Sequence, residues 1–394
     1  MRIAILSSTF SDSTLPLVKN LLIRGCDVDY YYFVFDKNSN QSTGFEFSTP
    51  PRKLGKFYDV DPNKSFGCKF IQNFKGSHIY VYQSPKTGNN SKGLVRILAK
   101  LYYKYKLKTL IKHIKAQKYD MIDIIGMHDE PIILHKMLKD EHCMLSFHEI
   151  YKSHLNNRQL DDAVLYALNK KLPIRVFSQN AQNDLLRIGD NKDSSISYIP
   201  FGLYEGYDDF DGIATSLNIR QKDYILYLGF IHPYKGISIL EEAFNSLQNA
   251  NIKLIIAGKG NDPALAKLQN NQKVLVFNRW ISNAEMVELV KNCKVVVCPY
   301  LSASQSGIPQ LAFNFGKPII ATKVGGFPFF IKDGDTGLLI EPNNSIQLRE
   351  AINRIFSDNN LYENLCANIR KFNDIMPEFS WDSIINKYLS QVNI

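Results

Sequence analysis

Residues 295–326 read VVVCPYLSASQSGIPQLAFNFGKPIIATKVGG, and this stretch decides the fold class. It opens with an apolar run of β-branched residues, which predicts a buried strand. A loop of small polar residues follows over 302–307, and a helical pattern then begins with Pro309 near its start. Gly316 and Pro318 end that helix, and a second apolar strand follows at once. Strand, loop, helix and strand in this order indicate a parallel sheet flanked by helices.

The polar loop follows a strand, and ligands of parallel sheets bind at the carboxyl ends of the strands. A helix N-terminus adds unpaired N–H groups and a partial positive charge, so the expected ligand is an anion, most often a phosphate. The candidate contacts in and after this loop are Ser304, Gln305, Ser306, Gly307 and Gln310. A polar turn without a ligand explains the loop alone equally well, so the rest of the chain decides.

The same alternation of strands and helices recurs along the whole chain. The expected strands are 3–8, 28–35, 78–82, 121–125, 143–147, 175–177 and 196–199 in the first half, and 224–228, 253–257, 274–277, 294–298 and 318–321 in the second. The predicted fold class is therefore α/β, with two doubly wound Rossmann-like domains facing across a cleft. We place the domains at 1–203 and 204–378, with an amphipathic helix at 379–394 crossing back onto the first.

Length and composition restrict the class of protein. At 394 residues, with 45% hydrophobic residues, the chain can form two domains of ordinary size. It contains no apolar run long enough to span a bilayer, and its first residues read as a strand rather than a signal peptide. The six cysteines are scattered without a CxxC pair, which is typical of core residues in a reducing cytoplasm rather than disulfides or zinc ligands.

Positive charge is concentrated in the first half of the chain. Residues 1–200 hold 29 Lys and Arg against 19 Asp and Glu, a net charge of +10, whereas the whole chain has a net charge of +9. Residues 92–118 carry nine of these cations and no acid, with Leu94, Ile97, Leu98, Leu101, Tyr105 and Leu110 expected on one side of a helix. A basic helix exposed to solvent is one interpretation. We favour a helix resting on anionic lipid, and no motif supports nucleic acid.

Several chemical signatures are absent from the sequence. It has no GxxxxGK[ST] motif, no HExxH and no GxSxG, and the glycines around Gly258 lack the third glycine of a dinucleotide fingerprint. GFIHPYKG at 229–236 is more informative, because Lys235 follows a strand and can reach a phosphate as a point charge, while Gly236 permits close backbone approach. Arg279 follows a neighbouring strand, so we expect it to converge with Lys235 and the 306–307 turn on one diphosphate.

The segments GFIHPYKG (229–236), LIIAGKG (254–260), FNRWIS (277–282), 298–326 and KDGDTGLLIEP (332–342) together resemble retaining glycosyltransferase family 4, whose fold is GT-B. In the first half the likeness is looser and rests on LSFHEI (145–150), FSQNA (177–181) and YIPFG (198–202). The resemblance implies transfer of a sugar from a nucleotide diphosphate sugar, with retention of anomeric configuration and without a required metal or other cofactor.

By this resemblance Lys235 binds the donor diphosphate, and His148 with Glu149 lies near the transferred sugar or the acceptor. Gly229, Gly236 and Gly258 belong to the expected substrate contacts, and His148, Lys235 and Arg279 to the expected catalytic residues. The family usually has an arginine where this chain has Phe230, and Arg279 is the expected replacement. The family's two glutamates fall at Ala303 and Leu311, so this chain resembles a subgroup with an SQSG loop.

The expected function is a metal-independent hexosyltransferase that acts on a lipid-linked or growing surface glycan, such as a capsule or O-antigen. We expect it in the cytoplasm, peripherally bound to the inner face of the plasma membrane, with no nucleic-acid partner. Two alternatives stay open at this point. One is another GT-B nucleotide-sugar enzyme, such as an epimerase or a phosphorylase. The other is a non-catalytic relative that binds a nucleotide or a glycan, which the missing glutamates suggest.

Overall fold

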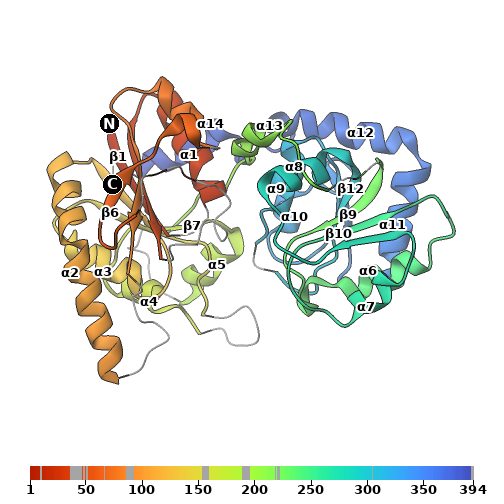
Figure 1. The fold of residues 1–394 in the computed structure, drawn as a ribbon, viewed down its shortest axis with the longest axis horizontal. Coiled ribbons are helices and arrows are strands. Elements are labelled where there is room, and N and C mark those ends of the chain that lie inside the picture. The colour runs from red at the N-terminus through yellow and green to blue at the C-terminus, as the bar shows by residue number, and fades with distance from the viewer. Residues whose placement is uncertain are drawn as a thin grey trace. The chain divides into compact units, whose positions relative to one another are not determined.

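The computed structural model describes the chain except residues 9–10, 36–46, 48, 50–51, 66, 86–92, 153–158, 189–195, 218, 220–221, 304 and 392–394. Ser304 and Lys92, which the sequence singles out, therefore lie outside the described residues. The chain folds as two compact units, each built around one sheet (Figure 1). Unit 1 comprises Met1–Phe201 and Trp381–Ile394, and unit 2 comprises Gly202–Ser380.

The sheet of unit 1 has the strand order β3-β4-β2-β1-β5-β6-β7-β8. Every neighbouring pair is parallel except β3 and β4. The strands are β1 (Arg2–Ser7), β2 (Asp27–Val34), β3 (Phe57–Asp59), β4 (Ile79–Gln83), β5 (Met121–Ile125), β6 (Cys143–Phe147), β7 (Ile174–Val176) and β8 (Ile196–Tyr198). The helices of this unit are α1 (Ser11–Ile23), α2 (Gly93–Gln117), α3 (Asp129–Met137), α4 (Asp162–Asn169), α5 (Gln179–Ile188) and α14 (Trp381–Ser390), with short 3-10 helices η2 (Pro62–Lys64) and η3 (Lys69–Asn73).

The sheet of unit 2 is parallel throughout, in the order β11-β10-β9-β12-β13-β14. Its strands are β9 (Tyr224–Leu228), β10 (Leu254–Ala257), β11 (Val274–Phe277), β12 (Cys293–Cys298), β13 (Ile319–Thr322) and β14 (Gly337–Ile340). Its helices are α6 (Ile237–Asn245), α7 (Ala264–Gln269), α8 (Asn283–Asn292), α9 (Ile308–Asn314), α10 (Phe327–Phe330), α11 (Ser345–Ser357), α12 (Asn359–Arg370) and α13 (Phe372–Ile375), with 3-10 helices η4 (Glu205–Phe210), η5 (Pro233–Lys235) and η6 (Pro377–Phe379). Figure 1 shows α6 and α7 on one side of this sheet and α8 and α9 on the other.

The α/β class predicted from the alternating pattern is confirmed by these two parallel sheets. Central strands such as β12 have continuous apolar runs because helices cover both of their faces. The sequence analysis did not predict two of the strands. β3 lies inside the polar stretch 37–75 and pairs antiparallel at the sheet edge. β14 is a four-residue strand, GLLI, which is too short to show a period.

The last helix, α14, belongs to unit 1 although it follows the whole of unit 2 in the sequence. It packs on α1, and its Tyr388 hydroxyl donates a hydrogen bond of 3.0 Å to Asp123 on β5. Asp123 also forms a fully buried ion pair of 3.3 Å with Arg175 on β7. Since a buried charge is costly unless paired, these contacts fix the helix at one position on the sheet.

The basic helix α2 differs from the prediction in one respect. Leu110 was expected on the same side as Leu94, Ile97, Leu98, Leu101 and Tyr105, and this is wrong. Leu110 is fully buried against the sheet of unit 1, while the other five side chains are exposed. Among the described residues, no helix is long and apolar enough to cross a membrane.

Candidate functional site

In each sheet the chain reverses its direction of winding at one pair of neighbouring strands. In unit 2 the reversal lies between β9 and β12, because β10 and β11 follow on one side and β13 and β14 on the other. In unit 1 it lies between β1 and β5. The loops after such strands diverge and leave a crevice, which is where open α/β sheets bind ligands. The GFIHPYKG and SQSG loops follow β9 and β12, so they occupy the reversal point of unit 2.

Backbone contacts join these two loops. Gly236 has a φ of 72° and ψ of 31°, a left-handed conformation, and a Cβ added to it would come within 1.8 Å of the Pro299 carbonyl oxygen. Only glycine fits there, so the start of α6 lies directly against the loop after β12. The Leu301 N–H also donates a 2.8 Å hydrogen bond to the Tyr234 carbonyl. Gly258 allows a similar approach, with its missing Cβ 1.8 Å from the Gly229 carbonyl oxygen.

Lys235, at the end of η5, is a partly buried cation. Its Nζ lies 3.8 Å from the ring centroid of Tyr300 and 5.1 Å from that of Tyr234. Burial lowers the pKa of Lys235 from 10.5 to about 8, because the ammonium has lost much of its water. Among the described residues no carboxylate forms an ion pair with it. A desolvated cation that faces aromatic rings rather than a carboxylate favours an anionic ligand.

Tyr300 connects this lysine to the SQSG loop, and the sequence analysis did not single it out. Its buried ring faces Lys235, and its hydroxyl lies 3.4 Å from the Ser306 Oγ. Ser306 also accepts a 3.4 Å hydrogen bond from the Ile308 N–H at the start of α9. Within the described part of the chain, the buried Oε1 of Gln310 accepts no hydrogen bond. Lys235 and Ser306 therefore meet at Tyr300 and bring a cation and a hydroxyl to the reversal point. Gln310, with its unsatisfied oxygen, lies in the first turn of α9, the helix that follows this loop.

The two loop residues flanking Ser306, Gln305 and Gly307, are partly buried. The positions of the two glutamates of the resembled family are occupied by Ala303, which is partly buried, and Leu311, which is 2% exposed. Leu311 packs in the core, so this turn of α9 carries no acid toward the loop.

Arg279 has a different environment from the one expected. It follows β11 at the edge of the sheet, two strands from β9. Its guanidinium forms two hydrogen bonds, of 2.7 and 2.8 Å, with the Glu285 carboxylate. Glu285 also closes the capping box of α8 with Ser282 and raises the pKa of Arg279. The structure thus brings Lys235 and Ser306 together, whereas it engages Arg279 with a carboxylate of its own.

His148 directly follows β6 in unit 1 and is 9% exposed. Its ring stacks on Phe177 at 4.3 Å and on Phe201 at 4.9 Å between centroids. Burial, together with the nearby charge of Arg175, lowers the pKa of His148 well below its usual value, so the imidazole is neutral at pH 7. Glu149, its neighbour, is partly buried.

A second histidine, His128, lies closer to the reversal point of unit 1, and the sequence analysis missed it. It follows β5 and is half exposed, while its Nδ1 lies 2.6 Å from Asp161, whose side chain is fully buried. The Asp161 carboxylate also accepts hydrogen bonds from the His128 and Ala163 N–H groups. The φ of His128 is 63° with ψ of −130°, a conformation that is strained for a residue other than glycine. The only sequence signal was GMHDE at 126–130, directly after a strand at 121–125.

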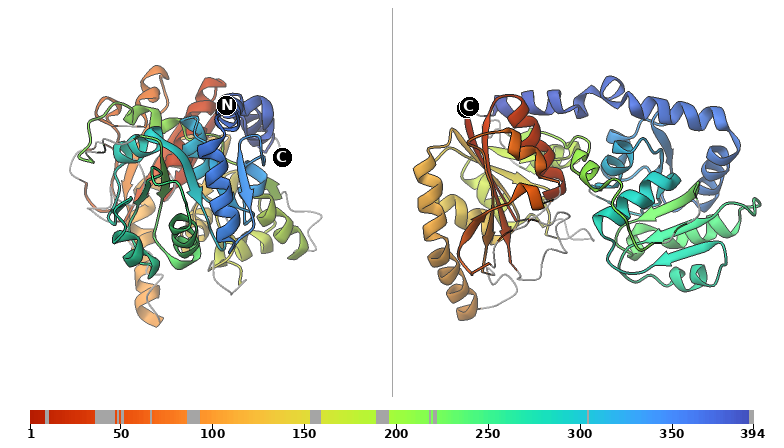
Figure 2. Two further views of the ribbon diagram at one scale, coloured as in Figure 1. Left: turned by 90° about the vertical axis from the view of Figure 1, so that its right-hand side faces the viewer. Right: turned by 45° about the horizontal axis from the view of Figure 1, so that its top comes forward.

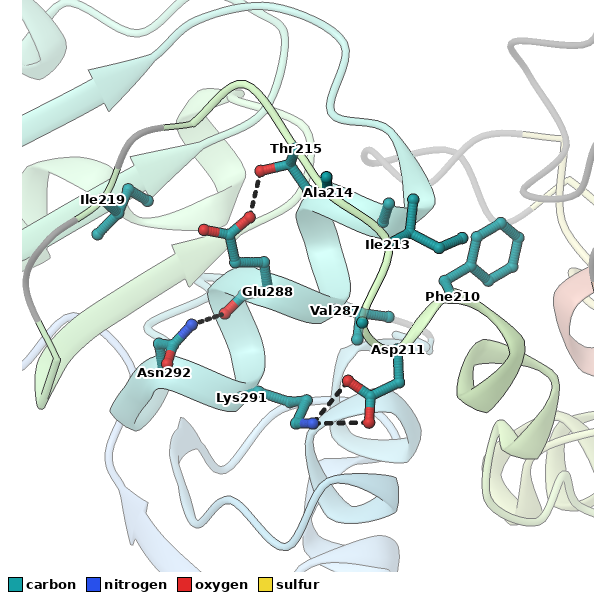
Figure 3. A pocket seen from close by; sticks show the side chains of 12 residues that line it. Phe210, Asp211, Ile213, Ala214, Thr215, Ile219, Val287, Glu288, Lys291 and Asn292 are labelled. Atoms are coloured by element: carbon teal, nitrogen blue, oxygen red, sulfur yellow. Dashed lines mark hydrogen bonds and ion pairs between the residues drawn. The ribbon is translucent and has the colours of Figure 1, made fainter.

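A separate cavity of about 800 Å³ lies between α8 and residues 210–215, with Ile219 also in its lining (Figure 3). Its polar side chains are engaged with one another or with the backbone, as Lys291 is with Asp211 and Glu288 with Thr215. Its lining runs along α8 from Ala284 to Asn292 and does not include Lys235 or Ser306. Among the described residues, no cluster of three or more His, Cys, Asp or Glu side chains is arranged to hold a metal ion.

Comparison with solved structures identifies the architecture. Anabaena HepE in complex with UDP and glucose matches the chain with a TM-score of 0.66 and 14% identity, over 100% of this chain and 99% of that one. The fold is GT-B. A glycosyltransferase from Rickettsia africae has the same GT-B architecture, with a TM-score of 0.67 and 17% identity, over 99% of this chain and 97% of that one.

Sequence comparisons agree with the GT-B fold. Residues 210–372 match the family model "Glycosyl transferases group 1". The O-antigen chain mannosyltransferase C of Escherichia coli is 28% identical over 200 residues, 49% of this chain and 53% of its own length. The lipopolysaccharide 1,2-N-acetylglucosaminetransferase of Salmonella typhimurium is 27% identical over 221 residues, 50% of this chain and 56% of its own length. The chain thus spans about half the length of the curated relatives it matches.

Proposed function

We propose that the chain transfers a sugar from a nucleotide diphosphate sugar onto a lipid-linked or growing surface glycan, with retention and without a required metal ion. The observation that carries this proposal is Lys235, a desolvated cation at the reversal point of a GT-B sheet, against the ring of Tyr300, whose hydroxyl contacts Ser306. HepE, which shares the fold, is described with UDP and glucose. The relatives named for O-antigen and lipopolysaccharide synthesis support a surface glycan as the acceptor class.

The proposed donor site follows from charge. A nucleoside diphosphate gains negative charge as the bond from its β-phosphate oxygen to the anomeric carbon breaks. A preorganised ammonium such as that of Lys235 stabilises this charge most strongly where water is excluded. UDP and GDP sugars both suit the site, and Ser304, Gln305 and Gly307 are the proposed further contacts. Arg279 is a weaker candidate than Lys235, because Glu285 already neutralises its charge.

Retention has a physical rationale in this chain. Ala303 and Leu311 offer no carboxylate nucleophile of the glycosidase kind. We therefore propose front-face attack, in which the acceptor oxygen bonds to the anomeric carbon as the phosphate oxygen leaves and takes the acceptor proton. His148 is the proposed neutral contact to the transferred sugar. His128, held by Asp161, is the proposed positioning group for the acceptor hydroxyl, because an exposed imidazole anchored by a buried carboxylate keeps one orientation.

The reaction is tested with purified protein, radiolabelled UDP and GDP sugars, and an extracted lipid-linked glycan fraction. We expect a labelled glycolipid from one donor and no product from Lys235→Met. The matched control is Lys253→Met, because Lys253 is also partly buried but precedes the amino end of β10, whereas Lys235 follows the carboxyl end of β9. Conversion of the donor without acceptor would instead assign an epimerase. Nucleotide binding without any turnover would assign a non-catalytic relative.

We further propose that the enzyme acts at the inner face of the plasma membrane, where lipid-linked acceptors are built. The net charge of +10 over residues 1–200 supports this location, because anionic lipid attracts such a surface. Fractionation of cells that express the full chain tests it. Recovery in the membrane pellet at low salt and release at high salt are expected, whereas recovery in the supernatant at both would contradict it.

A further inference from the structure

Helix α2 of unit 1 has two apolar faces on opposite sides. From residue 103 onward, one side of the helix packs against the sheet through Tyr103, Leu107, Leu110, Ile111 and Ile114, all of them buried. Its N-terminal half exposes large apolar side chains to solvent: Leu94 (70% exposed), Val95 (63%), Ile97 (57%), Leu98 (56%), Leu101 (57%), Tyr102 (46%) and Tyr105 (62%). We call this second set the outer face of α2.

The helix geometry separates the two faces. Successive side chains turn by about 100° around a helix axis, so Leu101 and Tyr103 point about 200° apart. Positions 94, 97, 98, 101 and 105 therefore form one stripe, nearly opposite the stripe of 103, 107, 110 and 114. The outer face thus cannot turn toward the core while the other stripe is packed. Figures 1 and 2 show the N-terminal end of α2 projecting beyond the rest of unit 1.

Salt bridges hold this projecting end in place. Arg96 and Lys100, both in the N-terminal half of α2, contact Asp129 on α3 at 2.8 and 2.7 Å. They lower the pKa of Asp129, so its carboxylate is ionised at neutral pH. The orientation of the outer face is therefore fixed by the protein rather than left to a frayed helix end.

The charge beside the outer face has one sign. The helix contains seven Lys and Arg and no acid. Arg96 and Lys100 share one ion-pair partner, Asp129, and Lys115 pairs with Asp140. Lys104, Lys108 and Lys112 are exposed along the helix beyond the apolar stripe. An exposed apolar patch of this kind marks a contact surface, and lysines beside it select for an anionic partner.

We propose that α2 binds an anionic lipid bilayer, with the outer face immersed at the headgroup boundary and Lys104, Lys108 and Lys112 on the lipid phosphates. A second copy of the chain is a poorer occupant, because pairing two outer faces would bring both sets of lysines together. The helix lies along the bilayer surface and does not span it. The inference concerns attachment alone and stands apart from the donor site, since nucleotide binding can be measured without lipid.

The test is co-sedimentation of the purified full chain with vesicles of phosphatidylcholine, with and without phosphatidylglycerol. The wild type is expected to bind the vesicles that contain phosphatidylglycerol. Leu98→Glu with Leu101→Glu is expected to abolish binding. Replacing Lys104, Lys108 and Lys112 with Gln is expected to lower the partition coefficient roughly a hundredfold or more. All substituted side chains are exposed, so folding is expected to be preserved, and the thermal melt checks it.

The matched control is Leu186→Glu, on α5 of the same unit, where the leucine is 48% exposed outside α2. It should bind vesicles as the wild type does. The inference would be overturned if the wild type bound neither kind of vesicle. It would also be overturned if the variant with both Leu98→Glu and Leu101→Glu bound vesicles as the wild type does. A lipid-free dimer that the leucine substitutions convert to a monomer would overturn it too, because the outer face would then be a contact between copies. Unchanged nucleotide affinity in the variants separates this result from any failure of the proposed reaction.

Discussion

Replacing Lys235 with Met should make unit 2 more stable while it weakens nucleotide binding. Burial lowers the pKa of Lys235 from 10.5 to about 8. Keeping the ammonium charged at pH 7 therefore costs about 3–4 kcal/mol, at ~1.4 kcal/mol per pKa unit. The Tyr300 ring, 3.8 Å away, offsets about 1–2 kcal/mol of this cost. Methionine fills similar space without the charge, so the expected gain is about 2 kcal/mol.

The sign of this effect depends on pH in a defined way. A lysine whose pKa is lower in the folded state destabilises that state at every pH below about 8. The penalty fades as the pH rises from about 8 to 10.5, where the unfolded chain also loses its proton. The advantage of Lys235→Met is therefore complete at pH 7 and absent near pH 11.

Urea unfolding followed by tryptophan fluorescence measures this gain. The chain has two tryptophans, and Trp381 lies in unit 1. A Trp381→Phe background leaves Trp280 as the reporter of unit 2. Lys253→Met in the same background is the control and should show no comparable gain. If Lys235→Met lowers the stability of unit 2 at pH 7, the lysine makes net favourable contacts, and the claim that its buried charge destabilises the fold is refuted.

Three further outcomes are expected. The nucleotide affinity of the wild type should fall as the pH rises through about 8, whereas the affinity of Lys235→Arg should not change over that range because the pKa of arginine is far higher. The same pH dependence in both proteins would contradict the role of this charge. Arg279→Ala should lower the stability of unit 2 by about 1 kcal/mol through the loss of its Glu285 contacts, and it should weaken nucleotide binding, measured by calorimetry, far less than Lys235→Ala does. A larger loss of affinity in Arg279→Ala than in Lys235→Ala would make Arg279 the main phosphate ligand. His128→Gln should reduce kcat about a hundredfold with nucleotide Kd unchanged, and wild-type turnover in this variant would exclude His128 from the acceptor site.

The sequence predicts the sheets well because their strands are buried on both faces. Runs such as VVVC in β12 and LIIA in β10 have no exposed side that could interrupt the apolar pattern. The helix α2 shows where this reasoning fails. Its apolar residues serve the core in one half and an exposed face in the other, so one stripe drawn through Leu94 and Leu110 merges two opposite surfaces. Helical spacing alone places Leu110 opposite Leu101. The packing of Tyr103 and Leu107 shows which of the two stripes faces the core.

The candidate residues are predictable where each directly follows a strand. Lys235 and Ser306 lie in two loops that follow the adjacent strands β9 and β12, and the order of strand, loop and helix identifies both. The contacts of His128 with Asp161 and of Arg279 with Glu285 are different cases, because they depend on which side chains meet in three dimensions. Asp161 comes 33 residues after His128, and nothing in the local sequence marks the two as partners. Tyr300 likewise reads as the end of a strand until its ring is seen facing Lys235.

Calorimetric titration of UDP, GDP and their sugars into the wild type and Lys235→Met tests the central claim most directly. We expect one nucleotide family to bind the wild type, with the diphosphate bound more tightly than the nucleoside. Loss of a charged contact to phosphate should weaken that binding in Lys235→Met by about tenfold to a hundredfold. Binding that is unchanged by the substitution, or no binding of any nucleotide to the wild type, would contradict a donor diphosphate site at Lys235.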